Sequence, residues 1–93
     1  MDDKPKRVLV ESLRFTRERT KIVADVRRFD DAMRAIDFRL CRDPESGIQI
    51  SRGGLYATCI SFPDGTTFAI YYTFDDHQVV LESVRRDSLV FDW

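Results

Sequence analysis

Apolar residues recur with a helical period between residues 29 and 44 of this chain. Phe29, Met33, Ile36 and Leu40 follow one another at intervals of four, three and four positions. Residues at this spacing share one face of an α-helix. Pro44 disfavours helical backbone at the residue before it. The pattern therefore predicts an amphipathic helix that ends at Pro44 and buries one apolar stripe.

Three segments that follow this helix are rich in β-branched and aromatic residues, which is typical of strands. They are GLYATCISF (residues 54–62), TFAIYYTF (67–74) and QVVLESV (78–84), with turn residues between them. In the middle segment Phe68, Ile70, Tyr72 and Phe74 share one face of the strand. We expect that face to pack on the helical stripe, and the short turns predict antiparallel pairing.

The last of these segments mixes apolar and charged residues. Strict alternation puts Glu82 on the same face as Val80 and Val84. Either Glu82 is exposed, or this strand has neighbours on both faces. Arg85 and Arg86 come directly after the segment.

The N-terminal part of the chain predicts a short strand and a further helix. The run VLV (residues 8–10) indicates a strand. From Ser12, a candidate N-cap, to about Asp25, apolar residues fall roughly on one face of a helix. A break over residues 26–28, with Asp25 or Asp30 as a cap, would let the second helix fold back antiparallel as a helical hairpin.

Length and composition indicate one globular domain. A chain of 93 residues is too short to fill a second core. Its 15 basic residues nearly balance 16 acidic ones, which argues against a strongly basic nucleic-acid binder. Residues 4–28 nevertheless hold nine Lys or Arg against three acids, so the first helix could carry a basic face. With no signal-peptide pattern and no membrane-length apolar run, we expect a cytoplasmic protein that does not enter membranes.

The cysteines and the single histidine give no sign of a metal site. Cys41 and Cys59 lack metal-ligand spacing, and we expect both to be reduced core or near-core residues. His77 lies in a turn beside Asp75 and Asp76, which is typical of an exposed hairpin residue. The sequence therefore predicts neither a metal nor a cofactor.

Two stretches resemble patterns of the RelE/ParE family of bacterial toxins. They are the helix ending RLCRDPESG (residues 39–47) and the strand pair FAIYYTFDDHQVVLESVRR (68–86). The resemblance covers about residues 7–90. It implies an α+β fold for the single domain of residues 1–93. Residues 1–6 are polar and include Pro5, so we expect them to be disordered. In that fold an N-terminal strand and an α-helical hairpin pack on a twisted antiparallel sheet.

The resemblance also implies a function. The chain would be the toxin-like component of a bacterial type II toxin–antitoxin system, neutralised by an antitoxin peptide. The targets that it implies are mRNA on the ribosome, which some family members cut, or DNA gyrase, which others inhibit. The family's nucleases cluster basic side chains on the central strands, because the scissile phosphate needs charge stabilisation. Residues 54–62 contain no basic residue, so we expect binding rather than mRNA cleavage.

Three arginines are the candidates for a catalytic role: Arg52, Arg85 and Arg86. The resemblance would place a catalytic arginine at Arg85 or Arg86, and two guanidinium groups could hold a phosphate between them. The alternative is that they are solvated residues at a strand end. Arg52 lies in the glycine-containing loop of residues 51–54, where it fits equally well as a turn residue.

Four aromatic residues are the candidates for contact with a partner: Tyr56, Tyr71, Phe91 and Trp93. Tyr71 and Tyr72 are successive strand residues, so one should be in the core and the other could lie at a surface or cleft. The apolar tail that holds Phe91 and Trp93 either docks on the sheet or offers a patch to a partner. Docking is favoured, because exposed aromatic patches are uncommon on small monomers.

Three functions stay open at this point. The chain could be a toxin, a non-toxic binding module with a RelE/ParE-like fold, or a ribosome-dependent mRNA endonuclease that uses Arg85 or Arg86. A nuclease needs a cationic cleft and loses activity when either arginine is removed, whereas the other two functions require neither. The sequence leaves the oligomeric state and the cellular target open.

Overall fold

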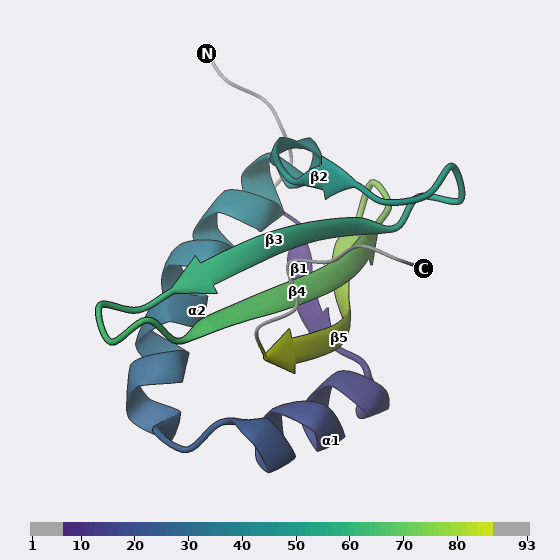
Figure 1. Cartoon of the computed structure of the whole chain (residues 1–93). Helices are drawn as coiled ribbons and strands as arrows, with labels where there is room; N and C mark the ends of the chain where they lie inside the picture. Colours follow the sequence, from purple (N-terminus) through teal and green to yellow (C-terminus); the bar gives the residue numbers. More distant parts are fainter. Residues whose placement is uncertain (1–6, 87–93) are drawn as a thin grey trace.

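The computed structural model describes residues 7–86, and the predicted disorder of residues 1–6 lies outside that range (Figure 1). Within it, two helices pack on a five-stranded sheet, which confirms the predicted α+β class. The elements in chain order are β1 (Val8–Glu11), α1 (Leu13–Ile22), α2 (Val26–Arg42), the 3₁₀ turn η1 (Pro44–Ser46), β2 (Ile48–Gln49), β3 (Tyr56–Ser61), β4 (Thr67–Phe74) and β5 (Gln78–Arg86).

The sheet is mixed rather than wholly antiparallel. Its strand order is β1-β5-β4-β3-β2. The strands β3, β4 and β5 pair antiparallel, as predicted. The short β2, which the sequence pattern did not predict, pairs antiparallel with β3. β1 lies parallel to β5 at the edge, with Val8 opposite Gln78 and Glu11 opposite Leu81. Parallel neighbours need a long connection, and here the rest of the fold separates the two strands in the chain. No local pattern sets the direction of such a pair.

Both helices begin at predicted caps, but the predicted break over residues 26–28 is wrong: these residues form the first turn of α2, and the break lies at residues 23–25. The Ser12 hydroxyl oxygen accepts a hydrogen bond from the Phe15 N–H at 3.0 Å. The Asp25 carboxylate accepts one from the Arg28 N–H at 3.1 Å. These bonds satisfy backbone N–H groups that have no partner within the helix. Of the two predicted caps for the second helix, Asp25 is the one used.

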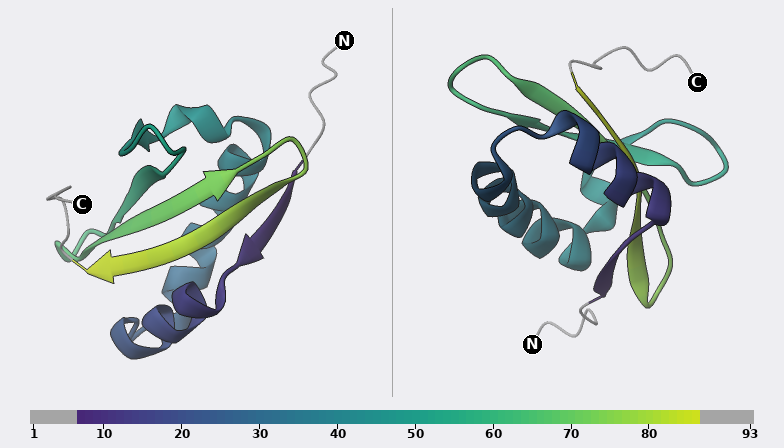
Figure 2. Two further views of the ribbon diagram at one scale, coloured as in Figure 1. Left: turned by 90° about the vertical axis from the view of Figure 1, so that its right-hand side faces the viewer. Right: turned by 90° about the horizontal axis from the view of Figure 1, so that it is seen from below.

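The two helices lie at a steep angle to each other, not side by side as the predicted antiparallel hairpin. Figure 1 shows α2 passing behind β3 and β4 and α1 running beneath the sheet. From below, α1 lies along β5 (Figure 2). The hydrogen bond from the Ser12 N–H to the Leu81 carbonyl oxygen, at 3.0 Å, holds the start of α1 against that strand.

A side chain of α1 completes the edge of β5 where β1 ends. Pairing between β1 and β5 stops at Leu81. Beyond it, the Glu18 carboxylate accepts hydrogen bonds from the Ser83 hydroxyl at 2.7 Å and the Val84 N–H at 3.1 Å. Glu18 thus satisfies a strand N–H that has no neighbouring strand to pair with. Together with the Ser12 hydrogen bond, this contact joins α1 to β5.

The core lies between α2 and the sheet, as the apolar stripe predicts. It joins the stripe to the predicted face of β4 and includes Phe29, Met33, Ile36, Leu40, Phe68, Ile70 and Tyr72. The rings of Phe29 and Phe68 meet edge to face with centroids 5.4 Å apart, a favourable aromatic geometry. Phe74 is only partly buried at the margin of this core.

A β-bulge in β5 overturns the strict alternation expected for this strand. Tyr71 faces Ser83 and Tyr72 faces Leu81, so Glu82 is the extra residue. The shift lets Leu81 and Val84 both enter the core, although three positions separate them. β5 also continues to Arg86, so the two arginines expected just after the strand are its last residues.

Candidate functional site

The structure does not bring the three candidate arginines together. Arg85 and Arg86 are successive strand residues and therefore point to opposite faces of the sheet. Arg86 is paired in register with Phe68, near the end of the sheet where β3 turns into β4. Arg52 is exposed in the loop between β2 and β3, at the opposite end of β3. A phosphate clamp made by neighbouring arginines is therefore absent from this arrangement.

The face of the sheet turned away from α2, here called the outer face, holds little positive charge. Among the strand residues that the structure describes, Arg85 is the one basic residue on it. Its guanidinium carbon lies 5.7 Å from the centre of the Tyr71 ring. A single cation of this kind differs from the cluster of basic side chains expected of a phosphate-cleaving surface.

Tyr71 occupies a second, smaller apolar cluster on the outer face. It packs with Ala57 and Ala69, and the partly buried Ile50 and Leu55 cover the cluster from the loop between β2 and β3. Tyr71 is 0% exposed. The structure therefore places the Tyr71 ring inside the fold and not at an accessible surface, and its contact with a partner stays a prediction. Tyr72 is also buried, so both neighbouring tyrosines serve as core residues.

The other predicted contact residues have different surroundings. Tyr56 is half-buried and stacks on Tyr72 with ring centroids 5.9 Å apart, so it belongs to the core margin and keeps part of its surface accessible. Phe91 and Trp93 lie outside the described residues. His77 is exposed in its hairpin, as predicted.

The two cysteines divide between core and surface. Cys41 is buried and Cys59 is exposed, so the prediction of a core or near-core position is wrong for Cys59. Alternation explains the difference, because Cys59 lies between the buried Thr58 and Ile60 of β3 and points to the outer face. Within residues 7–86, no group of three or more His, Cys, Asp or Glu residues is placed to hold a metal ion.

A pocket of about 100 Å³ lies under the linker that joins α1 to α2, and is here called the linker pocket. Its apolar lining comes from the end of α1, the linker, the start of α2 and both strands of the β3–β4 hairpin: Ile22, Val23, Ala24, Phe29, Phe62 and Phe68. Its polar lining consists of Asp25, Arg28, Asp64, Thr66 and Arg86. Of the three candidate arginines, Arg86 is the one that lines the linker pocket.

Arg28 and Asp64 form an ion pair at the rim of the linker pocket, with 2.9 Å between Nη1 and Oδ2. The Arg28 guanidinium also lies 4.3 Å over the Phe62 ring. Hydrogen bonds from Thr66 and Arg28 lower the pKa of Asp64 to about 2, so its carboxyl group is ionised at neutral pH. Sequence reasoning missed both residues, because 36 positions separate them and only the fold joins the helix start to the β3–β4 turn.

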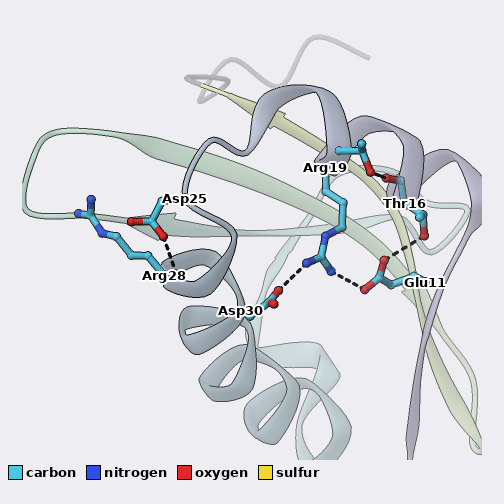
Figure 3. Close-up of polar contacts among 7 residues, drawn as sticks. Glu11, Thr16, Arg19, Asp25, Arg28 and Asp30 are labelled. Carbon is cyan, nitrogen blue, oxygen red and sulfur yellow. Dashed lines mark hydrogen bonds and ion pairs between the residues drawn. The ribbon is translucent and has the colours of Figure 1, made fainter.

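A partly buried ion-pair cluster joins β1, α1 and α2. Figure 3 shows the Arg19 side chain of α1 reaching between Glu11 and Asp30. Its Nη1 lies 2.8 Å from Glu11, its Nη2 hydrogen-bonds Asp30, and its guanidinium lies 5.2 Å over the Phe29 ring. Arg19, on α1, therefore links Glu11 at the end of β1 to Asp30 in the first turns of α2.

Charge is unevenly divided between the helices and the rest of the fold. The residues of α1 and α2 include nine basic and four acidic ones, whereas residues 43–86 include three basic and six acidic ones. The predicted basic stretch thus belongs to the helical layer, where Arg14, Arg17 and Lys21 are exposed on α1. Within residues 7–86, formal positive charge is therefore concentrated in the two helices.

The sequence matches no protein-family model and no curated protein. No helix within residues 7–86 is both long and apolar enough to cross a membrane.

Proposed function

We propose that this protein is the toxin-like component of a bacterial type II toxin–antitoxin pair, neutralised by an antitoxin peptide and acting in the cytoplasm. The resemblance of residues 39–47 and 68–86 to RelE/ParE toxins is the observation that carries the proposal. The α+β architecture of two helices on a sheet agrees with the fold that this resemblance implies.

The proposed action is binding rather than cleavage of mRNA. Phosphoryl chemistry needs several cationic or acid–base groups around one phosphate. The candidate arginines lie on opposite faces or at opposite ends of the sheet, and the outer face offers Arg85 among its described strand residues. This dispersion favours a target such as DNA gyrase, or another protein, over ribosome-bound mRNA.

Controlled expression in a bacterial host tests the proposal. We expect growth to stop on induction and to recover when the product of the neighbouring reading frame is expressed together with it. We also expect the two proteins to purify as a stable complex. Unimpaired growth combined with a stable complex would instead indicate a non-toxic binding module of the same fold. Unimpaired growth without a complex would overturn both.

The endonuclease stays a second candidate because of Arg85. Arg85 is partly exposed on the outer face, with its guanidinium carbon 5.7 Å from the centre of the Tyr71 ring. Mapping of mRNA ends after induction separates the candidates. Cleavage within codons on translating ribosomes would favour the nuclease, and intact mRNA with altered DNA supercoiling would favour a gyrase inhibitor.

A further inference from the structure

The size and lining of the linker pocket suit a single apolar side chain. At about 100 Å³ it is well below the roughly 300–1,000 Å³ of ordinary small-molecule sites. Phe29 and Phe68 in its wall are buried, and Arg28 covers a face of the Phe62 ring. The wall therefore offers no open aromatic plane on which a nucleobase could stack. Single-stranded nucleic acids bind proteins largely through such stacking. A shallow apolar hole with a polar rim is the usual acceptor for an anchor residue of a protein partner.

Charges around the linker pocket favour an acidic partner. Both acids of its lining are engaged within the fold: Asp64 accepts hydrogen bonds from Thr66 and Arg28, and Asp25 caps α2. Lys21 and Arg27 are exposed on either side of the linker, and within residues 7–86 neither forms an ion pair. An approaching segment therefore meets net positive charge.

We propose that the linker pocket anchors the antitoxin through one apolar side chain of an acidic segment. A carboxylate next to that side chain pairs with Arg86 at the rim. The proposal rests on the proposed toxin function and names the site where the neutralising peptide docks. Apolar burial supplies the affinity, and the cationic surroundings select acidic segments and speed their association.

Two pocket variants and two matched controls test this site. Ala24→Phe places a ring at the exposed linker and fills the pocket, whereas Ala35→Phe makes the same change at an exposed position of α2 outside the pocket lining. Arg86→Glu reverses the charge at the rim, whereas Arg34→Glu reverses a highly exposed charge on α2. Circular dichroism and thermal unfolding first establish that all four variants fold.

Calorimetric titration with the product of the neighbouring reading frame is the first measurement. We expect Ala24→Phe and Arg86→Glu to weaken binding by about tenfold or more, as for hot-spot contacts. The two controls should change it by less than about threefold. Tight binding that neither pocket variant weakens would overturn the docking site and leave the toxin proposal standing.

Amide chemical shifts measured by NMR separate failure of the site from failure of the function. The probe is a short acidic peptide with one central leucine, compared with the same peptide carrying glycine in its place. We expect the leucine peptide to shift the amides of Ala24, Phe29 and Thr66 more than the glycine peptide does. If the leucine peptide shifts these amides but the product of the neighbouring reading frame does not bind, the docking site stands and the toxin proposal fails. If neither probe binds, or if an RNA oligonucleotide shifts these amides more strongly than the peptide, the docking proposal is overturned.

Discussion

The Tyr72 hydroxyl donates a 2.6 Å hydrogen bond to the carbonyl oxygen of Pro44, and this bond fastens the end of α2 to the middle of the sheet. Tyr72 is fully buried, and burial raises its pKa to about 12. Gly47 is the residue that makes room for the ring. A methyl group there would lie 2.2 Å from the Tyr72 hydroxyl and 2.7 Å from the Ala57 carbonyl oxygen. The turn after α2 thus depends on the Tyr72 hydroxyl and on the absence of a side chain at Gly47.

This contact predicts that Gly47 and Tyr72 are energetically coupled. We expect Tyr72→Phe to lower the free energy of unfolding by about 1–2 kcal/mol through loss of the hydrogen bond. Gly47→Ala should lower it by about 1–3 kcal/mol through overpacking. Gly47→Ala should cost less in the Tyr72→Phe background, because one of the two clashes is gone.

Urea unfolding of the two single variants and the double variant measures the coupling. Gly53→Ala is the matched control, since its methyl group would meet nothing closer than the Ser51 hydroxyl at 3.6 Å. Equal costs for Gly47→Ala and Gly53→Ala would contradict the proposed close contact.

The core contact between α2 and β4 predicts large losses on truncation. Ile36 is 7% exposed and Ile70 is 0% exposed, and both belong to the main core. We expect Ile36→Ala and Ile70→Ala each to cost about 2–5 kcal/mol, because each removes buried methylene groups and leaves a cavity. Lys21→Ala, at an exposed position of α1, is the control. A shift of the unfolding midpoint no larger than that of the control would refute this packing.

The Glu18 contact with β5 predicts a stability that depends on acid pH. Burial by itself would raise the pKa of Glu18, but hydrogen bonds from Ser83, Val84 and Arg14 bring it below its ordinary value of 4.5. A lowered carboxyl pKa stabilises the fold above pH 4.5, and this contribution is lost as the pH falls through the lower, folded-state pKa.

We therefore expect Glu18→Gln to be less stable than the native protein at pH 7, with the difference shrinking as the pH falls below 4.5. Chemical unfolding between pH 7 and pH 3 measures the difference, with Glu45→Gln at an exposed position as control. A difference that stays constant over this range would show that the Glu18 charge contributes nothing.

The Arg19 cluster predicts that one arginine stabilises the join between three elements. Its side chain is 21% exposed and contacts both Glu11 and Asp30. We expect Arg19→Met, which keeps an apolar stem, to cost about 1–3 kcal/mol, because hydrogen bonds to charged groups are lost. Arg34→Met removes the highly exposed pair with Asp31 and should change stability by less than about 1 kcal/mol. Thermal unfolding compares the stabilities of Arg19→Met and Arg34→Met. Equal losses of stability would mean that the Arg19 cluster contributes no more than an exposed ion pair.

The dispersed arginines predict that the purified protein does not cut mRNA on translating ribosomes. A nuclease surface binds a polyanion and needs converging positive charge, whereas Arg85 and Arg86 point to opposite faces. Primer extension on mRNA from a translation reaction, with and without the protein, measures cleavage. Specific cuts between codon positions that disappear in Arg85→Ala or Arg86→Ala, but persist in Arg34→Ala, would show that a single arginine suffices.

Part of the candidate site could be predicted from the sequence. The pattern identified Arg86 as a residue of interest, although as one of a pair that the strand geometry separates. It gave no signal for Arg28 or Asp64, which meet across 36 positions. It also could not show that Tyr71 is buried, because alternation assigns a residue to a face and does not say what covers that face.

The sequence by itself determined the local structure. Its apolar period, its cap at Ser12 and its strand-forming segments are properties of short stretches, and each depends on backbone geometry within one or two turns or along one strand. The pairing of the α2 stripe with β4 also followed, because these are the two largest apolar faces and each must be buried.

Only the tertiary structure decided the long-range relations. They are the parallel placement of β1 beside β5, the steep angle of α1, the bulge at Glu82 and the closure of the linker pocket. Each depends on contacts between residues far apart in the chain, such as Glu18 with Ser83. Such contacts stabilise one arrangement among several that the same local preferences allow, so no short stretch of sequence encodes them.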